Sequence, residues 1–169
     1  MSVNPKLLEA LEQAIQAEIE GYHFYTMVAA ATKDPKGKEM FEALAQDEVR
    51  HTEFLRAQHH ALEATGRVDT LISIVGEPGF EAGTPFFSDK FKQRASKAHF
   101  EMTALSVGAQ LEADAMKFYR EQAEITDDAS VAALFRELAM WEQGHHDALV
   151  AQMKELEQEY WAVNRFAPF

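Results

Sequence analysis

The chain contains no cysteine among its 169 residues. This absence excludes disulfides, a cysteine nucleophile, thiolate zinc sites and iron–sulfur centres held by thiolates. Basic residues are scarce, because 16 Lys and Arg stand against 28 Asp and Glu, for a formal net charge of −12. A chain this acidic binds nucleic-acid phosphates and anionic lipid poorly, so neither nucleic acid nor a membrane is expected as a partner.

Long hydrophobic runs are also missing, and no stretch approaches the roughly 20 apolar residues of a membrane-spanning helix. The start, Met1–Pro5, has no basic segment followed by an apolar one, so no signal peptide is expected. Together with the lack of cysteine, this favours a cytoplasmic protein. The hydrophobic fraction, 47%, is nevertheless high enough for one domain with a buried core.

Only five prolines interrupt the chain. Pro5 and Pro35 each follow an Asn or Asp, which is the pattern of an N-cap before the first helical position. Between the breaks, apolar residues recur at spacings of three and four. These signals predict an all-α chain with four main helices, near 5–32, 35–64, 103–126 and 129–160. The Gly- and Pro-rich segment 65–102 is predicted to be a crossover, with Val68–Val75 extended and a short capped helix near 89–98.

The sequence repeats itself, without a gap, at a shift of 94 residues. Between 18–58 and 112–152, 14 of 41 positions are identical. Two helical hairpins could share Leu and Ala by convergence, but they have less reason to share polar residues. The polar matches include Glu18 with Glu112, Glu48 with Glu142, and His51 with His145. We interpret the chain as one domain, 1–163, built from hairpin repeats 5–64 and 103–160, with a tail at 164–169.

The matched Glu and His residues are predicted to meet in the middle of the bundle. In each hairpin the two glutamates are 30 residues apart, equidistant from the turn at roughly 22 Å. Each Glu-x-x-His motif places a carboxylate and an imidazole on one helix face, one turn apart. Buried carboxylates alone would be very unfavourable, whereas two metal ions would compensate their charge. A thiolate-free set suits iron or manganese, with zinc as a substitute.

The predicted metal ligands are Glu18, Glu48, His51, Glu112, Glu142 and His145. The first glutamate of each hairpin would bind mainly one metal ion, the glutamate of each Glu-x-x-His motif would bridge both, and each histidine would bind one. Glu20 is a less favoured rival because it lies off the face that Glu18 shares with Tyr25. His146 is less favoured because the repeat pairs His51 with its neighbour.

Tyr25 and Tyr119 lie seven residues after Glu18 and Glu112, on the same helix faces. Each hydroxyl is predicted to hydrogen-bond a ligand glutamate, which would orient that ligand. The alternative is a core tyrosine whose hydroxyl bonds elsewhere. Both repeats keep the tyrosine, which favours the first interpretation.

Other matched positions differ between the repeats. Asp47 corresponds to Trp141, so the surroundings of the two metal ions are expected to differ. Gly21 and Gly108 lie inside predicted helices, where glycine costs up to about 1 kcal/mol relative to alanine. They are expected to allow close approach of neighbouring helices.

These residues resemble those of the ferritin-like di-iron carboxylate proteins, most closely the rubrerythrin family. The resemblance covers nearly all of 5–160 and rests on the Glu…Tyr pairs and the two Glu-x-x-His motifs. Bundles of this class take one glutamate from each of two helices and Glu-x-x-His from the other two. The resemblance implies an up-down-down-up four-helix bundle with a long crossover between its second and third helices. It also implies two iron ions, which often react with hydrogen peroxide, and commonly a homodimer.

Two departures from the rubrerythrin pattern bear on function. Rubrerythrins proper carry a C-terminal rubredoxin domain that delivers electrons, and this chain has no cysteine to form one. The electron donor is therefore expected to be external, such as a separate rubredoxin or a flavoprotein. Rubrerythrins also carry an extra glutamate one turn past the third-helix ligand, tied to their peroxide chemistry. Position 115 is alanine here and Asp114 is the nearest acid, which argues against efficient peroxidase activity.

Three functions are compatible with this sequence. The first is a di-iron oxidoreductase that reduces hydrogen peroxide. The second is a ferroxidase that oxidises Fe(II) with dioxygen for storage or delivery. The third is a non-catalytic metal-binding module, in which zinc or manganese stabilises the bundle and a partner protein binds. The aromatic segment Tyr160–Phe166 is expected to fold back on the bundle or to form a dimer contact.

Overall fold

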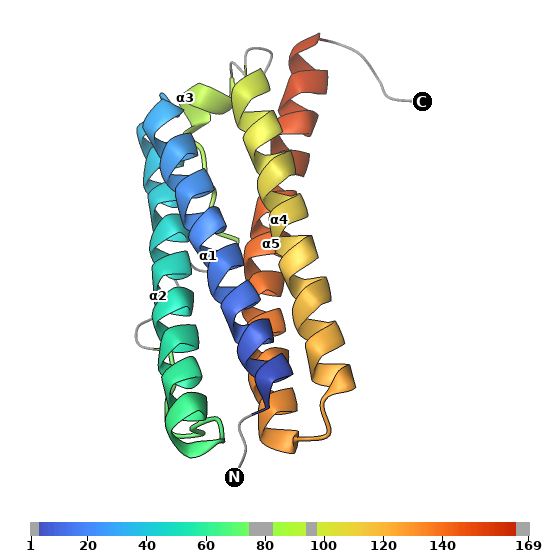
Figure 1. Ribbon diagram of the computed structural model, residues 1–169. Coiled ribbons are helices and arrows are strands. Elements are labelled where there is room, and N and C mark those ends of the chain that lie inside the picture. The colour runs from blue at the N-terminus through green and yellow to red at the C-terminus, as the bar shows by residue number, and fades with distance from the viewer. Residues whose placement is uncertain (1–3, 75–82, 94–97, 165–169) are drawn as a thin grey trace.

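The described part of the chain contains four long helices and one short helix (Figure 1). The computed structural model describes residues 4–74, 83–93 and 98–164. The helices are α1 (Pro5–Ala31), α2 (Pro35–Thr65), α3 (Asp89–Lys92), α4 (His99–Ile125) and α5 (Ala129–Asn164). These ranges contain no β-strand, which confirms the predicted all-α class. None of the described helices is long and apolar enough to cross a membrane.

The helix ends follow from local sequence. The Asn4 side chain accepts a hydrogen bond from the backbone N–H of Lys6, at 3.1 Å, and Pro5 opens α1. Asp34 caps α2 in the same way through the N–H of Gly37, at 3.1 Å. Gly66 ends α2 in the left-handed conformation, with φ 74°, where a side chain would be strained. The expected caps are therefore confirmed.

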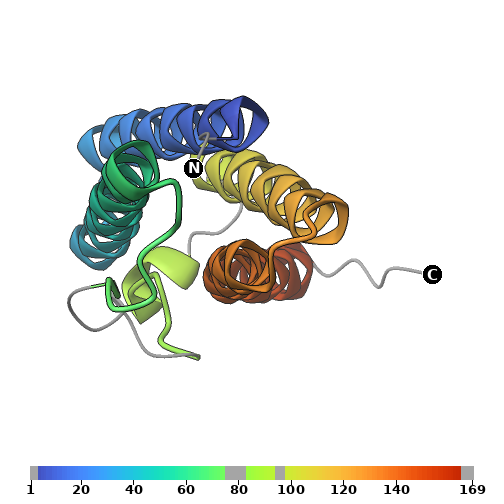
Figure 2. The ribbon, with the colours of Figure 1, turned by 60° about the horizontal axis from the view of Figure 1, so that its bottom comes forward.

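The connectivity is up-down-down-up, as predicted (Figure 1). α1 and α2 form one hairpin, α4 and α5 form the other, and α1 also packs against α4. Seen obliquely from one end of the bundle, α3 and the described crossover residues next to it lie between α2 and α5 (Figure 2). It is attached there by the N–H of Phe86, which donates to Gln152 at 2.7 Å, and by that of Ser88, which donates to Asp34 at 3.0 Å.

Three predicted boundaries need correction. α4 begins at His99 rather than near 103, and α5 continues to Asn164 rather than ending near 160. The chain has no proline or glycine between 145 and 167, so nothing stops α5 earlier. The short helix near 89–98 spans only Asp89–Lys92 within the described residues. Residues 68–74 form no strand, while Val75 and Arg165–Phe169 of the tail lie outside the described residues.

The apolar core is divided into two clusters, one towards each end of the bundle. The first includes Phe41, Leu105 and Leu149, with Phe86 and Phe87 added by the crossover. The second is built around Leu11, Leu55, Phe135 and Leu138. Residues at intermediate positions of all four long helices, including both Glu-x-x-His motifs, lie between the clusters. The fold therefore encloses a polar layer between two apolar ones.

Candidate metal centre

All six predicted metal ligands lie in this polar layer. α1 supplies Glu18, α4 supplies Glu112, and α2 and α5 each supply one Glu-x-x-His pair. All six residues are buried, with exposures of 1–6%. The four long helices thus bring together residues that are up to 127 positions apart in the sequence, from Glu18 to His145.

The six side chains form two groups that share two members. Ligand atoms of Glu18, Glu48, His51 and Glu142 lie within 4.8 Å of one another. Glu48, Glu112, Glu142 and His145 form a second group within the same limit. Glu48 and Glu142 belong to both groups, which is the arrangement that bridging ligands require. Metal binding by these residues stays a prediction, and this geometry supports it.

Both imidazole rings present Nδ1 to the carboxylates. His51 Nδ1 lies 3.1 Å from Glu18 Oε2 and 3.1 Å from Glu142 Oε1. His145 Nδ1 lies 3.3 Å from Glu142 Oε2 and 3.8 Å from Glu112 Oε1. The rings stack on each other, with centroids 5.4 Å apart. Two imidazole nitrogens and at least one oxygen from each of the four glutamates therefore lie close together.

The donor set fits a pair of metal ions. Both carboxylate oxygens of Glu142 are buried and make no hydrogen bond within the described residues, although imidazole nitrogens face them. Such oxygens are costly to bury, and a cation would compensate them. Carboxylate and imidazole ligands without thiolate are those of iron and manganese sites.

The carboxylates disturb each other's ionisation. Burial, followed by the charges of Glu18 and Glu112, raises the pKa of Glu48 well above its ordinary value. Burial and the charge of Glu142 likewise raise the pKa of Glu112. Burial alone would also raise the pKa of Glu142, but the neighbouring histidines, His51 first, lower it. Without metal ions, bound protons thus neutralise part of the negative charge of these carboxylates. Metal ions would displace those protons when they bind.

Each tyrosine hydroxyl holds a glutamate of the opposite hairpin. The Tyr25 hydroxyl donates a hydrogen bond to Glu112, and the Tyr119 hydroxyl donates one to Glu18. Burial and then the nearest glutamate charge raise the pKa of both tyrosines, so both stay protonated and act as donors. The sequence placed each tyrosine near the glutamate of its own helix, and the structure shows that the contact crosses between the hairpins.

The rival residues lie outside the centre. Glu20 is exposed and accepts a hydrogen bond from Gln16 at 2.9 Å. His146 lies 3.2 Å from Asp147 and joins neither group of ligand atoms. Glu18 and His145 therefore lie in the groups of possible ligand atoms and their two rivals do not, while metal binding itself stays a prediction.

Two helix glycines make room for side chains of the centre. A Cβ atom on Gly21 would lie 3.2 Å from Cδ of Glu48, and one on Gly108 would lie 3.2 Å from the Tyr25 hydroxyl oxygen. Both distances are closer than ordinary van der Waals contact. The close approach expected at these glycines is therefore found, and the groups that approach them are the side chains of Glu48 and Tyr25.

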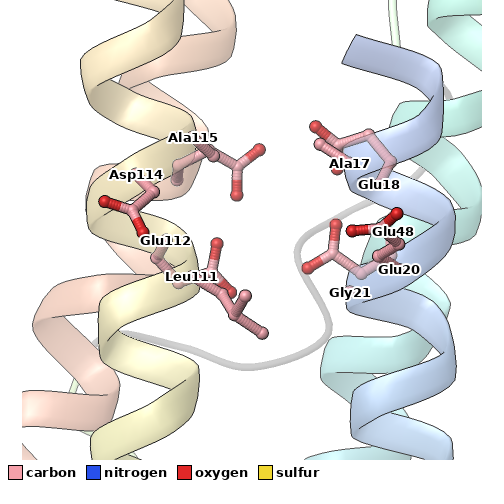
Figure 3. A pocket seen from close by; sticks show the side chains of 10 residues that line it. Ala17, Glu18, Glu20, Gly21, Glu48, Leu111, Glu112, Asp114 and Ala115 are labelled. Carbon is pink, nitrogen blue, oxygen red and sulfur yellow. The ribbon is translucent and has the colours of Figure 1, made fainter. Parts of the chain in front are cut away.

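A pocket of about 200 Å³ opens beside the centre, between α1 and α4 (Figure 3). Small residues, Ala17, Gly21 and Ala115, line it together with the exposed Leu111. Ligand carboxylates border it, and the exposed acids Glu20 and Asp114 also lie along it. This opening was not predicted from the sequence, although small residues next to the predicted ligands were a signal for it.

The surroundings of the two histidines differ, as expected from the mismatch in the repeat. Nε2 of His145 lies 3.2 Å from Oδ2 of Asp47, which also pairs with Arg50. The ring of His51 instead stacks on Trp141, with centroids 5.3 Å apart and planes at 17°. The role of Arg50 was not visible in the sequence.

A bundle with one glutamate on each of two helices and Glu-x-x-His on the other two defines the class of ferritin-like di-iron carboxylate proteins. Comparison with family models agrees, because residues 9–104 and 103–167 both match the model described as Rubrerythrin. The chain belongs to the rubrerythrin family, which confirms the resemblance noted from the sequence. Comparisons with curated proteins and with solved structures gave no match.

Removal of both bridging candidates tests the ligand assignment. The double variant Glu48→Ala, Glu142→Ala should lose both metal ions, because each group of ligand atoms loses two members. The helices should persist, because the two apolar clusters remain intact. Elemental analysis and circular dichroism measure the two effects. Two tightly bound metal ions per chain in this variant would show that the assignment is wrong.

Stability of the metal-free protein should fall as the pH rises from ~5 to ~8. Burial raises the pKa of Glu48 above 4.5, and the charge of Glu142, acting against burial, raises that of His51 above 6.5. The folded state then binds more protons than the unfolded state, so the free energy of unfolding decreases with pH. The lowered pKa of Glu142 adds a loss of stability only at more acidic pH, below about 4.5.

Thermal melts at several pH values, with chelator and with metal ions, measure this dependence. Bound metal ions should reverse its sign, because they displace the protons and bind better as the pH rises. A melting temperature of the metal-free protein that rises between ~5 and ~8 would contradict the expected protonation of the centre.

Substitution of Gly21 should weaken metal binding without unfolding the protein. In Gly21→Ala the new methyl group would press on the Glu48 carboxyl and shift it. Gly144→Ala is the matched control, since its Cβ would meet nothing within 4 Å and should stabilise α5 by about 0.5–1 kcal/mol. Metal titration and thermal melts compare the two. Equal metal affinity in both variants would show that Glu48 tolerates the methyl group.

Proposed function

We propose that the protein is a di-iron oxidoreductase that reduces hydrogen peroxide. The observation that carries this proposal is a buried set of four glutamates and two histidines beside a pocket of about 200 Å³. Pockets for larger organic substrates measure about 300–1,000 Å³. The size of this pocket favours a small oxidant over an organic substrate.

The six predicted ligands form two overlapping groups, and each group would hold one iron ion. Glu48 and Glu142 lie where they would bridge the ions, while His51 and His145 would bind one each. When bound, two Fe(II) ions supply the two electrons that, with two protons, convert hydrogen peroxide to two molecules of water. The metal ions are proposed to be iron because the family is a di-iron one, and manganese or zinc could take the same ligands.

The rest of the chain would orient and enclose the centre. The Tyr25 and Tyr119 hydroxyls hold the glutamates Glu112 and Glu18 in place through donated hydrogen bonds. The apolar clusters on both sides keep bulk water from the ligands. Among the described residues, the pocket between α1 and α4 would give a small molecule access to the centre.

Electrons for repeated turnover are proposed to come from a separate rubredoxin or a flavoprotein. The chain has no cysteine and therefore no thiolate-held iron–sulfur centre to carry them. A homodimer in the cytoplasm remains part of the proposal, in agreement with the sequence analysis.

A second candidate function is oxidation of Fe(II) with dioxygen. Its support is the pair of exposed acids along the pocket, Glu20 and Asp114, which would attract a cationic substrate. Ala115, which lies at the position of the family's extra glutamate, also favours this function over efficient peroxide chemistry.

Stopped-flow mixing of the anaerobic Fe(II)-loaded protein with hydrogen peroxide, and in parallel with dioxygen, tests these proposals. We expect peroxide to oxidise the iron faster, because it needs only the two electrons that the centre holds. The near-ultraviolet absorption of the oxidised iron gives both rates. The double variant Glu48→Ala, Glu142→Ala is the control for iron bound elsewhere.

Equal or faster oxidation by dioxygen would overturn the peroxidase proposal in favour of ferroxidase chemistry. A protein that binds zinc or manganese, loses helix and melting temperature on chelation, and oxidises no iron would be a structural metal module instead. Oxidation rates, metal content and thermal melts measured on the same preparation distinguish both of these results from the expected one.

A further inference from the structure

Two equivalent positions of the internal repeat contact the two histidines of the centre. Asp47 and Trp141 are related by the 94-residue shift, as are His51 and His145. Asp47 contacts His145, and Trp141 contacts His51. Each contact therefore joins one hairpin to the other, and the two contacts have the same place in each half. The two halves thus place a side chain at the same position beside each histidine, but one is a carboxylate and the other is an indole.

Asp47 fixes the orientation of His145. Its carboxylate lies 3.2 Å from Nε2, it is 2% exposed, and Arg50 pairs with it. When Asp47 is ionised it can only accept a hydrogen bond, and His145 then donates that bond from Nε2. In the neutral imidazole, which is the form that binds a metal ion, Nδ1 then directs its lone pair towards the carboxylates of Glu142 and Glu112, 3.3 and 3.8 Å away. This is the carboxylate–histidine–metal arrangement that raises the basicity of a ligating imidazole.

Trp141 gives His51 a different environment. Its indole stacks on the imidazole, with centroids 5.3 Å apart and planes at 17°. Phe54 packs edge-on against the same indole, at 5.4 Å. An indole has no hydrogen-bond acceptor, so it cannot take a proton from the imidazole. Trp141 restrains the ring by packing alone and adds no negative charge.

From this difference we propose that Asp47 is a positioning residue that makes the half of the centre at His145 bind its metal ion more tightly than the half at His51. The first ion to bind then occupies the half that contains Glu112 and His145, and the second occupies the half that contains Glu18 and His51. The inference rests on the proposed function only in requiring that the centre holds two ions. It concerns the order in which they bind, which neither the oxidant nor the electron donor determines.

Removal of an outer carboxylate of this kind lowers metal affinity by about 10- to 100-fold. The proposal therefore predicts two binding steps of unequal affinity in the unmodified chain. Asp47→Asn should weaken the first step by that factor and leave the second step nearly unchanged. The two steps then become similar.

The test is calorimetric titration of the full metal-free chain with Co(II), which also reports coordination through its visible absorption. Glu53→Gln is the matched control, because Glu53 is an exposed acid on the same helix and its loss removes one charge without touching a histidine of the centre. Circular dichroism checks that each variant is folded. Mössbauer spectra with one equivalent of iron-57 should show one dominant iron environment in the unmodified chain and two in Asp47→Asn.

Trp141→Asp provides the converse variant. By the symmetry of the repeat, the new carboxylate would lie beside His51, so the second binding step should become stronger. If this variant does not fold, because the indole also packs on Phe54, the Asp47→Asn result decides alone.

Two equal binding steps in the unmodified chain, or an equal weakening of both steps by Asp47→Asn, would overturn the inference and leave the proposed function intact. A loss as large in Glu53→Gln as in Asp47→Asn would also overturn it, because charge alone would then explain the effect. A chain that binds no pair of metal ions would instead contradict the proposed function.

Discussion

Four buried carboxylates, each with an oxygen within 4.8 Å of at least two of the others, are the constraint on which this structure depends. Without compensating groups, the ionised carboxylates would repel one another, and each would lose the hydration that stabilises its charge. The surrounding residues reduce that cost in different ways. Tyr25 and Tyr119 donate hydrogen bonds to two of the glutamates, and His51 and His145 bring positive charge when protonated. Metal ions in the centre would compensate the charge more completely.

The same interactions join the two halves of the bundle. Each hairpin packs within itself over its whole length, while the hairpins meet along α1 and α4 and through the crossover. The bonds from Tyr25 to Glu112, and from Tyr119 to Glu18, cross that boundary. The contacts of Asp47 and Trp141 with the histidines cross it as well. The centre is thus both the candidate functional site and a joint between the hairpins.

Much of this could be predicted because it depends on local or periodic signals. Capping residues set the starts of α1 and α2, and the repeat selected Glu18 over Glu20. The start of α4 and the end of α5 could not be placed, because no residue there starts or stops a helix strongly. Which glutamate each tyrosine contacts also escaped the sequence. That choice depends on how α1 and α4 pack, and no spacing along a single helix contains it.

The pocket shows why a ligand set does not by itself give a function. The predicted ligands occupy equivalent positions of the repeat and are identical in both halves. The pocket depends instead on positions where the halves diverge, such as Gly21 in one half and Ala115 in the other. A larger side chain at either position would occupy space next to Glu48 or Glu112. Small residues there leave the centre open to a small molecule, and the exposed acids Glu20 and Asp114 bias that opening towards cations. Any chemistry at the ligand set would thus depend on the residues that both halves share, whereas access to it depends on positions where the halves differ.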